Sequence, residues 1–132
     1  MKSLTIIQEN HPGLLAEVTT LLEEQGIAII DFSAQVVGAT AVISLTVEPY
    51  QEIFRLLSDY GYRVVASNHL LLRLQKHPGA LAELSRRLAQ ANVEVRGMHI
   101  VNKDDKEGIV ALETTDFEQA QALLSDILVW EP

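Results

Sequence analysis

Apolar side chains recur along this chain with two periods, and the switches between these periods predict its secondary structure. Around residues 27–37 and 41–47, apolar and more polar side chains alternate, which is typical of strands. Between residues 12 and 25, apolar side chains fall three and four positions apart, which places them on one face of a helix. The first half is therefore expected to contain strands at 2–8, 27–37, 41–47 and 62–66 and helices at 12–25 and 49–60.

The second half repeats this order. Leu81, Leu84 and Leu88 mark one face of its first helix, which is expected to end near Asn92. Asp116 and Gln119 have the spacing of a capping box and predict the start of its last helix. The expected strands of this half are 70–74, 93–103, 109–114 and 127–130.

Both halves thus follow the order β-α-β-β-α-β, which is typical of a ferredoxin-like module with an antiparallel four-stranded sheet and both helices on one face. We predict an α+β protein made of two such modules, residues 1–67 and 68–132. A module of this size buries only about 60% of the surface that its unfolded chain exposes, so it is marginal alone. We therefore expect the two modules to pack together and two chains to form a homodimer.

A short motif stands at the same place in both halves. The segment NHPGLLAEV, which starts at Asn10, returns 66 positions later as KHPGALAEL, which starts at Lys76. Pro12 is expected at the first helical position, and Gly13 lets a ligand approach the backbone, so we expect Gly13→Val to block binding while leaving the fold largely intact. The N–H groups at this helix start favour a small carboxylate. A bare helix start is the plainer interpretation of one copy, whereas two copies favour a binding site.

Composition and charge exclude several classes of function. The net charge is −8 and the pI is about 4.9, which argues against nucleic-acid binding because phosphates repel an acidic chain. The absence of cysteine excludes disulfides and thiol chemistry. Because no signal peptide precedes the first strand and no apolar run is long enough to span a membrane, we expect a cytoplasmic protein without membrane contact.

No catalytic or metal site is expected, and no cofactor. His11 and His77 lie 66 positions apart, and no third metal ligand stands at a useful spacing from them. Asp31 could meet the ammonium group of a ligand, although a solvated strand carboxylate is the plainer interpretation. The serines considered as nucleophiles lack a flanking elbow motif; they are Ser33, Ser44, Ser85 and Ser125.

The element order, together with the loop pattern (Asp/Asn)-x-Pro-Gly-(apolar)-Leu, resembles the ACT domain, a family of regulatory modules that bind amino acids. The resemblance extends over the whole chain. It implies two tandem modules whose sheets join side by side into one eight-stranded sheet. It also implies an amino acid bound at the seam, between the first loop of one module and the second strand of its neighbour. Carried over to this chain, the ligand-binding positions are Asn10, His11, Pro12, Gly13, Leu14, Ala28 and Ile29 in the first module and Lys76, His77, Pro78, Gly79, Ala80, Glu94 and Val95 in the second.

Two departures from the family pattern imply that the two sites differ. Serine-binding members carry an asparagine near the start of the second strand, where this chain has Ala28 and Glu94. The loop asparagine is kept as Asn10 but is replaced by Lys76 in the second copy. We expect the seam that combines Asn10 with Glu94 to bind the amino acid more tightly.

The resemblance implies a regulatory protein that senses an amino acid and has no catalysis of its own, with a biosynthetic enzyme as a candidate partner. The alternative is a constitutive regulatory or interaction subunit of an amino-acid biosynthetic enzyme, with no functional ligand site. Stabilisation of the fold by an added amino acid would separate the two.

Overall fold

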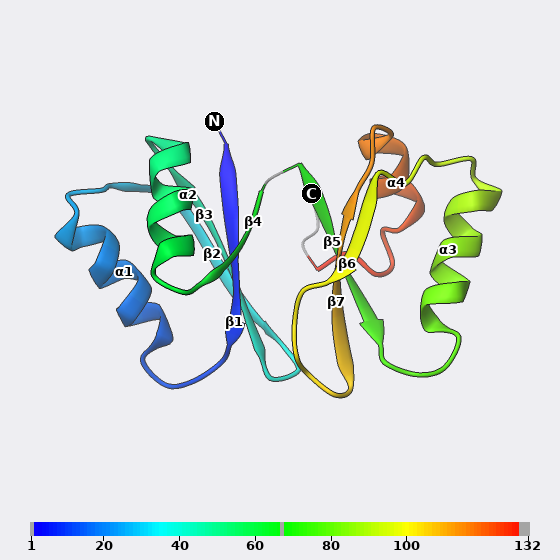
Figure 1. Cartoon of the computed structure of the whole chain (residues 1–132), viewed down its shortest axis with the longest axis horizontal. Coiled ribbons are helices and arrows are strands. Elements are labelled where there is room, and N and C mark those ends of the chain that lie inside the picture. Colours follow the sequence, from blue (N-terminus) through cyan, green and yellow to red (C-terminus); the bar gives the residue numbers. More distant parts are fainter. Residues whose placement is uncertain (1, 67, 130–132) are drawn as a thin grey trace. The chain divides into compact units, whose positions relative to one another are not determined.

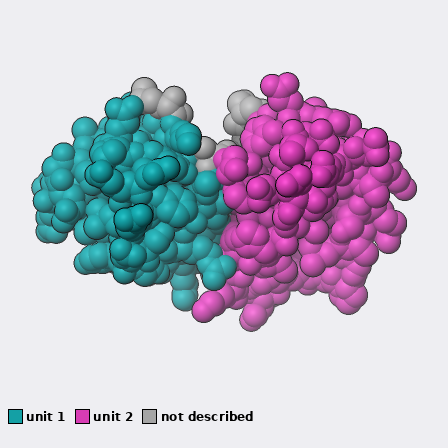
Figure 2. All heavy atoms as spheres, turned by 45° about the horizontal axis from the view of Figure 1, so that its top comes forward, with its two compact units in different colours: residues 1–67 teal, residues 68–132 magenta. Residues whose placement is uncertain are grey.

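The structure is a computed structural model, which describes residues 2–66 and 68–129. The chain divides into two compact units, Met1–Ser67 and Asn68–Pro132, coloured teal and magenta in Figure 2. Each unit has its own sheet and its own hydrophobic core.

The first unit contains six elements in the ferredoxin-like order. These are β1 (Ser3–Glu9), α1 (Leu14–Glu24), β2 (Ile29–Val37), β3 (Thr40–Val47), α2 (Tyr50–Asp59) and β4 (Arg63–Ala66). The antiparallel sheet has the order β2-β3-β1-β4, so β2 and β4 are its edge strands. Both helices lie on one side of this sheet (Figure 1). The apolar faces of the helices and of the central strands form the core, which includes Leu4, Ile6, Leu14, Val18, Leu22, Ile43, Leu45, Ile53 and Leu57.

The second unit contains five named elements. These are β5 (His69–Gln75), α3 (Ala80–Gln90), β6 (Gly97–Ile100), β7 (Glu107–Glu113) and α4 (Phe117–Leu123). They form an antiparallel sheet in the order β5-β7-β6. The core of this unit includes Leu70, Leu72, Leu84, Leu88, Val110, Leu112 and Ala120. The predicted α+β class and the tandem ferredoxin-like order are thus confirmed, whereas the joined eight-stranded sheet stays a prediction.

The strand expected at 127–130 is reduced to a single bridge, between Leu72 and Leu128, and Trp130 lies outside the described residues. The Arg73 N–H donates to the Ile127 carbonyl at 2.7 Å, and the Val129 N–H donates to the Leu71 carbonyl at 2.9 Å. Because the Ile127 N–H donates back to the Leu124 carbonyl, the turn after α4 reaches into the segment that was expected to be a strand.

The strand expected at 93–103 is also shorter, because side chains replace the ladder at both of its ends. Near its start, the Thr114 hydroxyl donates to the Glu94 carbonyl at 2.5 Å, and the Glu94 N–H donates to the Asp116 carboxylate at 3.0 Å. Near its end, the Asn102 amide donates to the Glu107 carbonyl and accepts from the Ile109 N–H, at 2.7 and 2.9 Å. Only Gly97–Ile100 keeps regular strand pairing.

The capping box expected at α4 does not form. Asp116 is the N-cap residue, but its side chain makes no capping hydrogen bond because it accepts from the Glu94 N–H. Gln119 donates to the Ala91 carbonyl at 2.8 Å instead. Both side chains therefore fasten the start of α4 to the segment that follows α3. None of the helices in the described ranges is long and apolar enough to cross a membrane.

Candidate functional site

The repeated motif forms the same turn in both units. In the first, the Leu14 N–H donates to the His11 carbonyl at 3.2 Å, and Gly13 has φ 87° and ψ −2°. In the second, the Ala80 N–H donates to the His77 carbonyl at 3.2 Å, and Gly79 has φ 89° and ψ −8°. These are the angles of a type II turn, which favours proline at its second position and glycine at its third. Pro12 therefore lies in the turn before α1, which corrects the expectation that it opens the helix.

Gly13 is required by its backbone conformation. A Cβ atom added to Gly13 would have no heavy atom within 4 Å, so space is not what excludes a side chain there. Its positive φ is unfavourable for a β-branched residue, however, because the side chain clashes with its own backbone. We therefore revise the expectation for Gly13→Val: valine would strain the turn itself and would not leave the fold unaffected.

A pocket of about 280 Å³ lies beneath the turn of the first unit. Its walls come from the loop, the first turn of α1, the later half of β2, and β3. The lining residues are Asn10, His11, Gly13, Leu14, Leu15, Ala16, Ala34, Gln35, Val36, Ala41 and Ile43.

The second unit has a pocket of about 480 Å³ at the corresponding place. It is lined by Leu74, Gln75, Lys76, His77, Pro78, Gly79, Ala80, Leu81, Ala82, Ile100, Gly108 and Val110. The strand registers show that the walls correspond: Ile43 pairs with Ile6 and Val110 pairs with Leu72, which are equivalent positions of β1 and β5. In the same way, Ala41 of the first pocket corresponds to Gly108 of the second. The fold thus builds one pocket twice.

Both pockets are lined by residues at a helix start whose backbone N–H groups have no helical acceptor. In α1, the first helical hydrogen bond is the one from the Glu17 N–H to the Gly13 carbonyl, at 2.9 Å. The N–H groups of Leu15 and Ala16 precede it, so no helical carbonyl is available to them. Leu81 and Ala82 hold the same positions in α3. Each pocket therefore offers backbone donors to an anionic group, in a place where the helix dipole adds to the attraction.

A polar chain next to the first pocket is absent from the second. The Tyr62 hydroxyl donates to Glu17 Oε1 at 2.5 Å, and Glu17 Oε2 lies 3.9 Å from His11 Nε2. Burial of Tyr62 raises the pKa of its phenol, and the hydrogen bond to the Glu17 carboxylate raises it further. The bridge of Leu72 with Leu128 matches the pairing of Ile6 with Val64, so Asp126 stands where the second unit would need this tyrosine. Both histidines make the same local contact, since the Nδ1–H of His11 donates to the Pro12 carbonyl and that of His77 to the Pro78 carbonyl, each at 3.0 Å.

The expected site residues separate into two groups within each unit. The first loop follows the end of β1, and most of its residues line the pocket. Ile29 instead pairs with Val47, next to the pairing of Ser3 with Thr46, so it lies where β1 begins. Ala28 precedes Ile29, and Glu94 and Val95 precede β6 in the same manner. Within one unit these two groups do not meet, and their joining across modules stays a prediction.

Glu94 already has partners inside its own unit. Its carboxylate accepts from Arg96 Nη1 and from the Thr115 hydroxyl, both at 3.3 Å. The carboxylate of Asp31, also considered for a ligand ammonium group, accepts from the Phe32 N–H at 2.9 Å. Residues missed from the sequence are those of the strand walls, chiefly Ala34, Val36 and Ile100. The shared strand face of Ala34 and Val36 was visible in the alternation, but its place beside the loop depends on the register.

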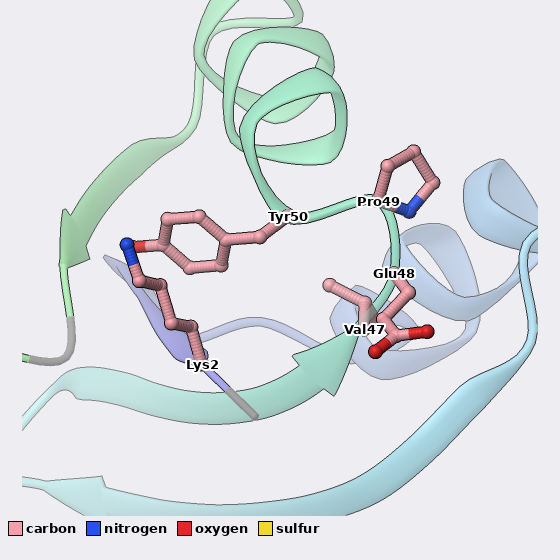
Figure 3. Close-up of a pocket in the computed structure, with 5 residues that line it drawn as sticks. All are labelled: Lys2, Val47, Glu48, Pro49 and Tyr50. Carbon is pink, nitrogen blue, oxygen red and sulfur yellow. The ribbon is translucent and has the colours of Figure 1, made fainter.

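Figure 3 shows another hollow of the first unit, of about 620 Å³, at the start of α2. Lys2 reaches the ring of Tyr50, with Nζ 5.6 Å from the ring centroid, whereas Glu48 and Pro49 point away from this pair. By the same registers, the corresponding positions of the second unit are Asn68, Thr114, Thr115, Asp116 and Phe117, so the aromatic ring is kept but the lysine is not. In the described part of the chain, no three histidine or carboxylate side chains group as metal ligands would. We therefore place the candidate site at the repeated loop.

Comparisons with known proteins agree with this architecture. The sequence matches the family described as an ACT domain pair over residues 1–128, whereas the curated proteins give no match. A similar solved structure is protein BT0572 from Bacteroides thetaiotaomicron, with a TM-score of 0.50 and 20% identity, covering 98% of this chain and 92% of that one.

Two further similar structures are subunits named for enzymes. The regulatory subunit of aspartate kinase from Thermus thermophilus has a TM-score of 0.43 and 17% identity, covering 95% of this chain and 91% of that one. The acetolactate synthase small subunit from Thermotoga maritima has a TM-score of 0.43 and 10% identity, covering 98% and 89%. The family match spans nearly all of the described residues and both copies of the loop, and the chain therefore belongs to the ACT domain pair family.

Proposed function

We propose that this chain is a regulatory protein that binds a small amino acid in the pocket of its first unit and has no catalysis of its own. The observation that carries the proposal is the repeated pocket: a turn of one sequence pattern covers a cavity with corresponding walls in each unit. Because the same turn covers a cavity in both units, a binding site is favoured over a simple helix start. Membership of a family of amino-acid-binding regulatory modules supports the same conclusion.

The groups around the first pocket suit a zwitterion. Backbone donors of Leu15 and Ala16 favour the carboxylate, and Asn10 offers both a donor and an acceptor. Val36, Ala41 and Ile43 give an apolar wall for a side chain. A volume of about 280 Å³ favours a small amino acid.

A regulatory role requires a protein partner, and we propose an amino-acid biosynthetic enzyme in that role. We also propose that the chain forms a homodimer. Three large apolar side chains on the edge strand β2 support an interface there: Ile30, Phe32 and Val36 are 49%, 41% and 52% exposed. Exposed edge strands with apolar side chains are commonly covered by another chain. A monomer at micromolar concentration in a sedimentation experiment would overturn the dimer.

The test is a thermal-shift screen of the twenty amino acids on the whole chain and on two variants. Ala34→Ile fills the first pocket with the residue that the second unit carries at that place, Ile100. Ala28→Ile is the matched control, since it makes the same substitution just before β2, where the other expected site residues lie. Both alanines are exposed, so neither change disturbs the core.

We expect one or a few amino acids to raise the melting temperature of the parent and of Ala28→Ile, but not of Ala34→Ile. If Ala28→Ile alone loses the response, the ligand lies at the start of β2, as the sequence first suggested. If no amino acid stabilises the parent, the chain is the constitutive subunit of the alternative.

A further inference from the structure

The second pocket differs from the first in charge. Its lining residues include no carboxylate, and Lys76 is its only lysine or arginine, at the position of Asn10 in the first pocket. No ion pair joins Lys76 to an acidic side chain within residues 2–66 and 68–129. A positive charge in a pocket without a counter-charge favours an anionic ligand.

The stem of Lys76 runs along the pocket wall. The place that a Cβ atom of Gly108 would take lies 3.5 Å from both Cγ and Cε of Lys76, so the stem covers the glycine that lines the pocket floor. The backbone is held there, because the Lys76 N–H donates to the Lys106 carbonyl at 2.7 Å. Lys76 thus lines the cavity from an anchored backbone, and its side chain is exposed.

The second pocket is also larger and more aliphatic. In the first unit, the Leu14 side chain is 2% exposed and belongs to the core under the turn. Ala80 replaces it in the second unit, and the pocket volume rises from about 280 to about 480 Å³. Aliphatic side chains form the walls of the larger pocket: Leu74, Leu81, Ile100 and Val110.

We infer that the second pocket binds an aliphatic monocarboxylate that has no ammonium group, such as a branched-chain fatty acid or 2-oxo acid. Lys76 pairs with the carboxylate, and the aliphatic walls hold the branched tail. An amino acid is disfavoured, because its ammonium group would lie near that of Lys76 and would find no carboxylate among the lining residues. The inference rests on the proposed function, since it gives a different ligand class to the second copy of the same pocket.

Four probes of one carbon skeleton test the inference by calorimetry on the whole chain: 4-methylpentanoate, 4-methyl-2-oxopentanoate, leucine and 3-methylbutylamine. Each is titrated into the parent and into Ala34→Ile, in which the first pocket is filled. In Ala34→Ile, we expect both carboxylates to bind at least about tenfold more tightly than leucine, because their carboxylate pairs with Lys76 and they carry no ammonium group. We expect the amine not to bind, because its ammonium group is repelled by that of Lys76. A preference for the oxo acid assigns the pocket to 2-oxo acids, and equal binding assigns it to simple carboxylates.

Lys76→Met removes the charge and keeps the stem, and Lys106→Met, an exposed lysine of the neighbouring hairpin, is its matched control. We expect Lys76→Met to weaken carboxylate binding at least about tenfold and Lys106→Met to change it little. Leucine that binds Ala34→Ile as tightly as the carboxylates do, or carboxylate binding that Lys76→Met leaves unchanged, would overturn the inference.

The same data keep the two proposals apart. Carboxylate binding that depends on Lys76, in a chain that no amino acid stabilises, supports the inference and removes the amino-acid function of the first pocket. Amino-acid binding that Ala34→Ile abolishes, without any carboxylate binding, leaves the function and removes the inference. Circular dichroism of each variant shows whether its fold is intact.

Discussion

The two copies of the pocket share a backbone and differ in their side chains. The turns agree within a few degrees at Gly13 and Gly79, and the strand walls have the same register. Yet Leu14 and Asn10 of one pocket correspond to Ala80 and Lys76 of the other. The Pro-Gly turn therefore fixes where a cavity forms, whereas the residues beside the turn set its volume and charge.

The last segment of each unit is attached to the rest of that unit in a different way. In the first, β4 pairs with β1 over four residues, and Tyr62 binds the α1 carboxylate Glu17. In the second, the segment after α4 makes a single bridge, and Arg87 of α3 holds it by donating to the Asp126 carboxylate at 2.8 Å and to the Leu123 carbonyl at 2.9 Å. The surface ion pair of Arg87 and Asp126 thus takes the place of β4 and the buried Tyr62 phenol of the first unit.

The largest expected effect comes from exchanging the residues under the two turns. Leu14→Ala removes a side chain that is 2% exposed and should lower the free energy of unfolding by about 2–5 kcal/mol, because a cavity remains. Ala80→Leu fills an open pocket and should cost far less. Urea unfolding of both variants measures the difference. Equal losses in the free energy of unfolding would contradict the conclusion that a core side chain, Leu14, fills part of the first pocket only.

A smaller effect is expected from the hydrogen bond between Tyr62 and Glu17. Tyr62→Phe should destabilise the chain by about 1 kcal/mol at neutral pH, because the charge-assisted hydrogen bond from the buried phenol to Glu17 is lost. Glu17→Gln keeps an acceptor for the Tyr62 hydroxyl and removes only the charge, so it should cost less than Tyr62→Phe. Glu83→Gln, at the equivalent place of the second unit, should be nearly neutral. A double-mutant cycle with Tyr62→Phe and Glu17→Gln checks the coupling, and additive effects would show that the bond contributes little.

The same bond predicts a stability change at high pH. The pKa of Tyr62 is raised in the folded chain, first by burial and then by Glu17, above the value of about 10 for an exposed phenol. Its stabilisation is therefore present below pH about 10 and is lost as the pH rises further, because the unfolded chain releases the proton first. The parent should lose stability above pH 10 more steeply than Tyr62→Phe, and parallel pH profiles of the two would contradict this assignment.

The smallest effect concerns the pair that closes the second unit. The hydrogen bond from Arg87 lowers the pKa of Asp126, so the pair stabilises the fold above the ordinary aspartate pKa of about 3.9 and is lost as the pH falls through the lowered value. Because the Asp126 side chain is 61% exposed, we expect less than about 1 kcal/mol. Asp126→Asn should flatten this part of the profile of unfolding free energy against pH. A loss of stability much larger than about 1 kcal/mol would mean that the pair contributes more to the second unit than its exposure indicates.

The sequence predicted most elements because their apolar periods are regular, as at Leu14, Val18 and Leu22 of α1. The prediction was wrong where a side chain replaces a strand partner in hydrogen bonds to the backbone, as Asn102 does at the end of β6. Hydrophobic periodicity does not indicate such a contact. The repeated Pro-Gly pattern marked the loop that lines the pocket, but it led to the expectation that Pro12 opens the helix, whereas Pro12 and Gly13 form a type II turn before α1. The prediction missed the wall formed by Ala34 and Val36, because the hairpin of β2 and β3 lies beside the loop only through the long-range pairing of β3 with β1.

An NMR titration of the isotope-labelled whole chain tests whether the turn builds a binding pocket in each unit. Amide signals are followed for the turn and first helical residues of both units while the stabilising amino acid, and then 4-methylpentanoate, is added. We predict that the amino acid shifts the amides of Gly13, Leu15 and Ala16 and that the carboxylate shifts those of Gly79, Leu81 and Ala82. Shifts that appear instead around Lys2 and Tyr50, or around Ala28 and Glu94, with the amides of both turns unchanged, would show that the turns do not form the binding sites.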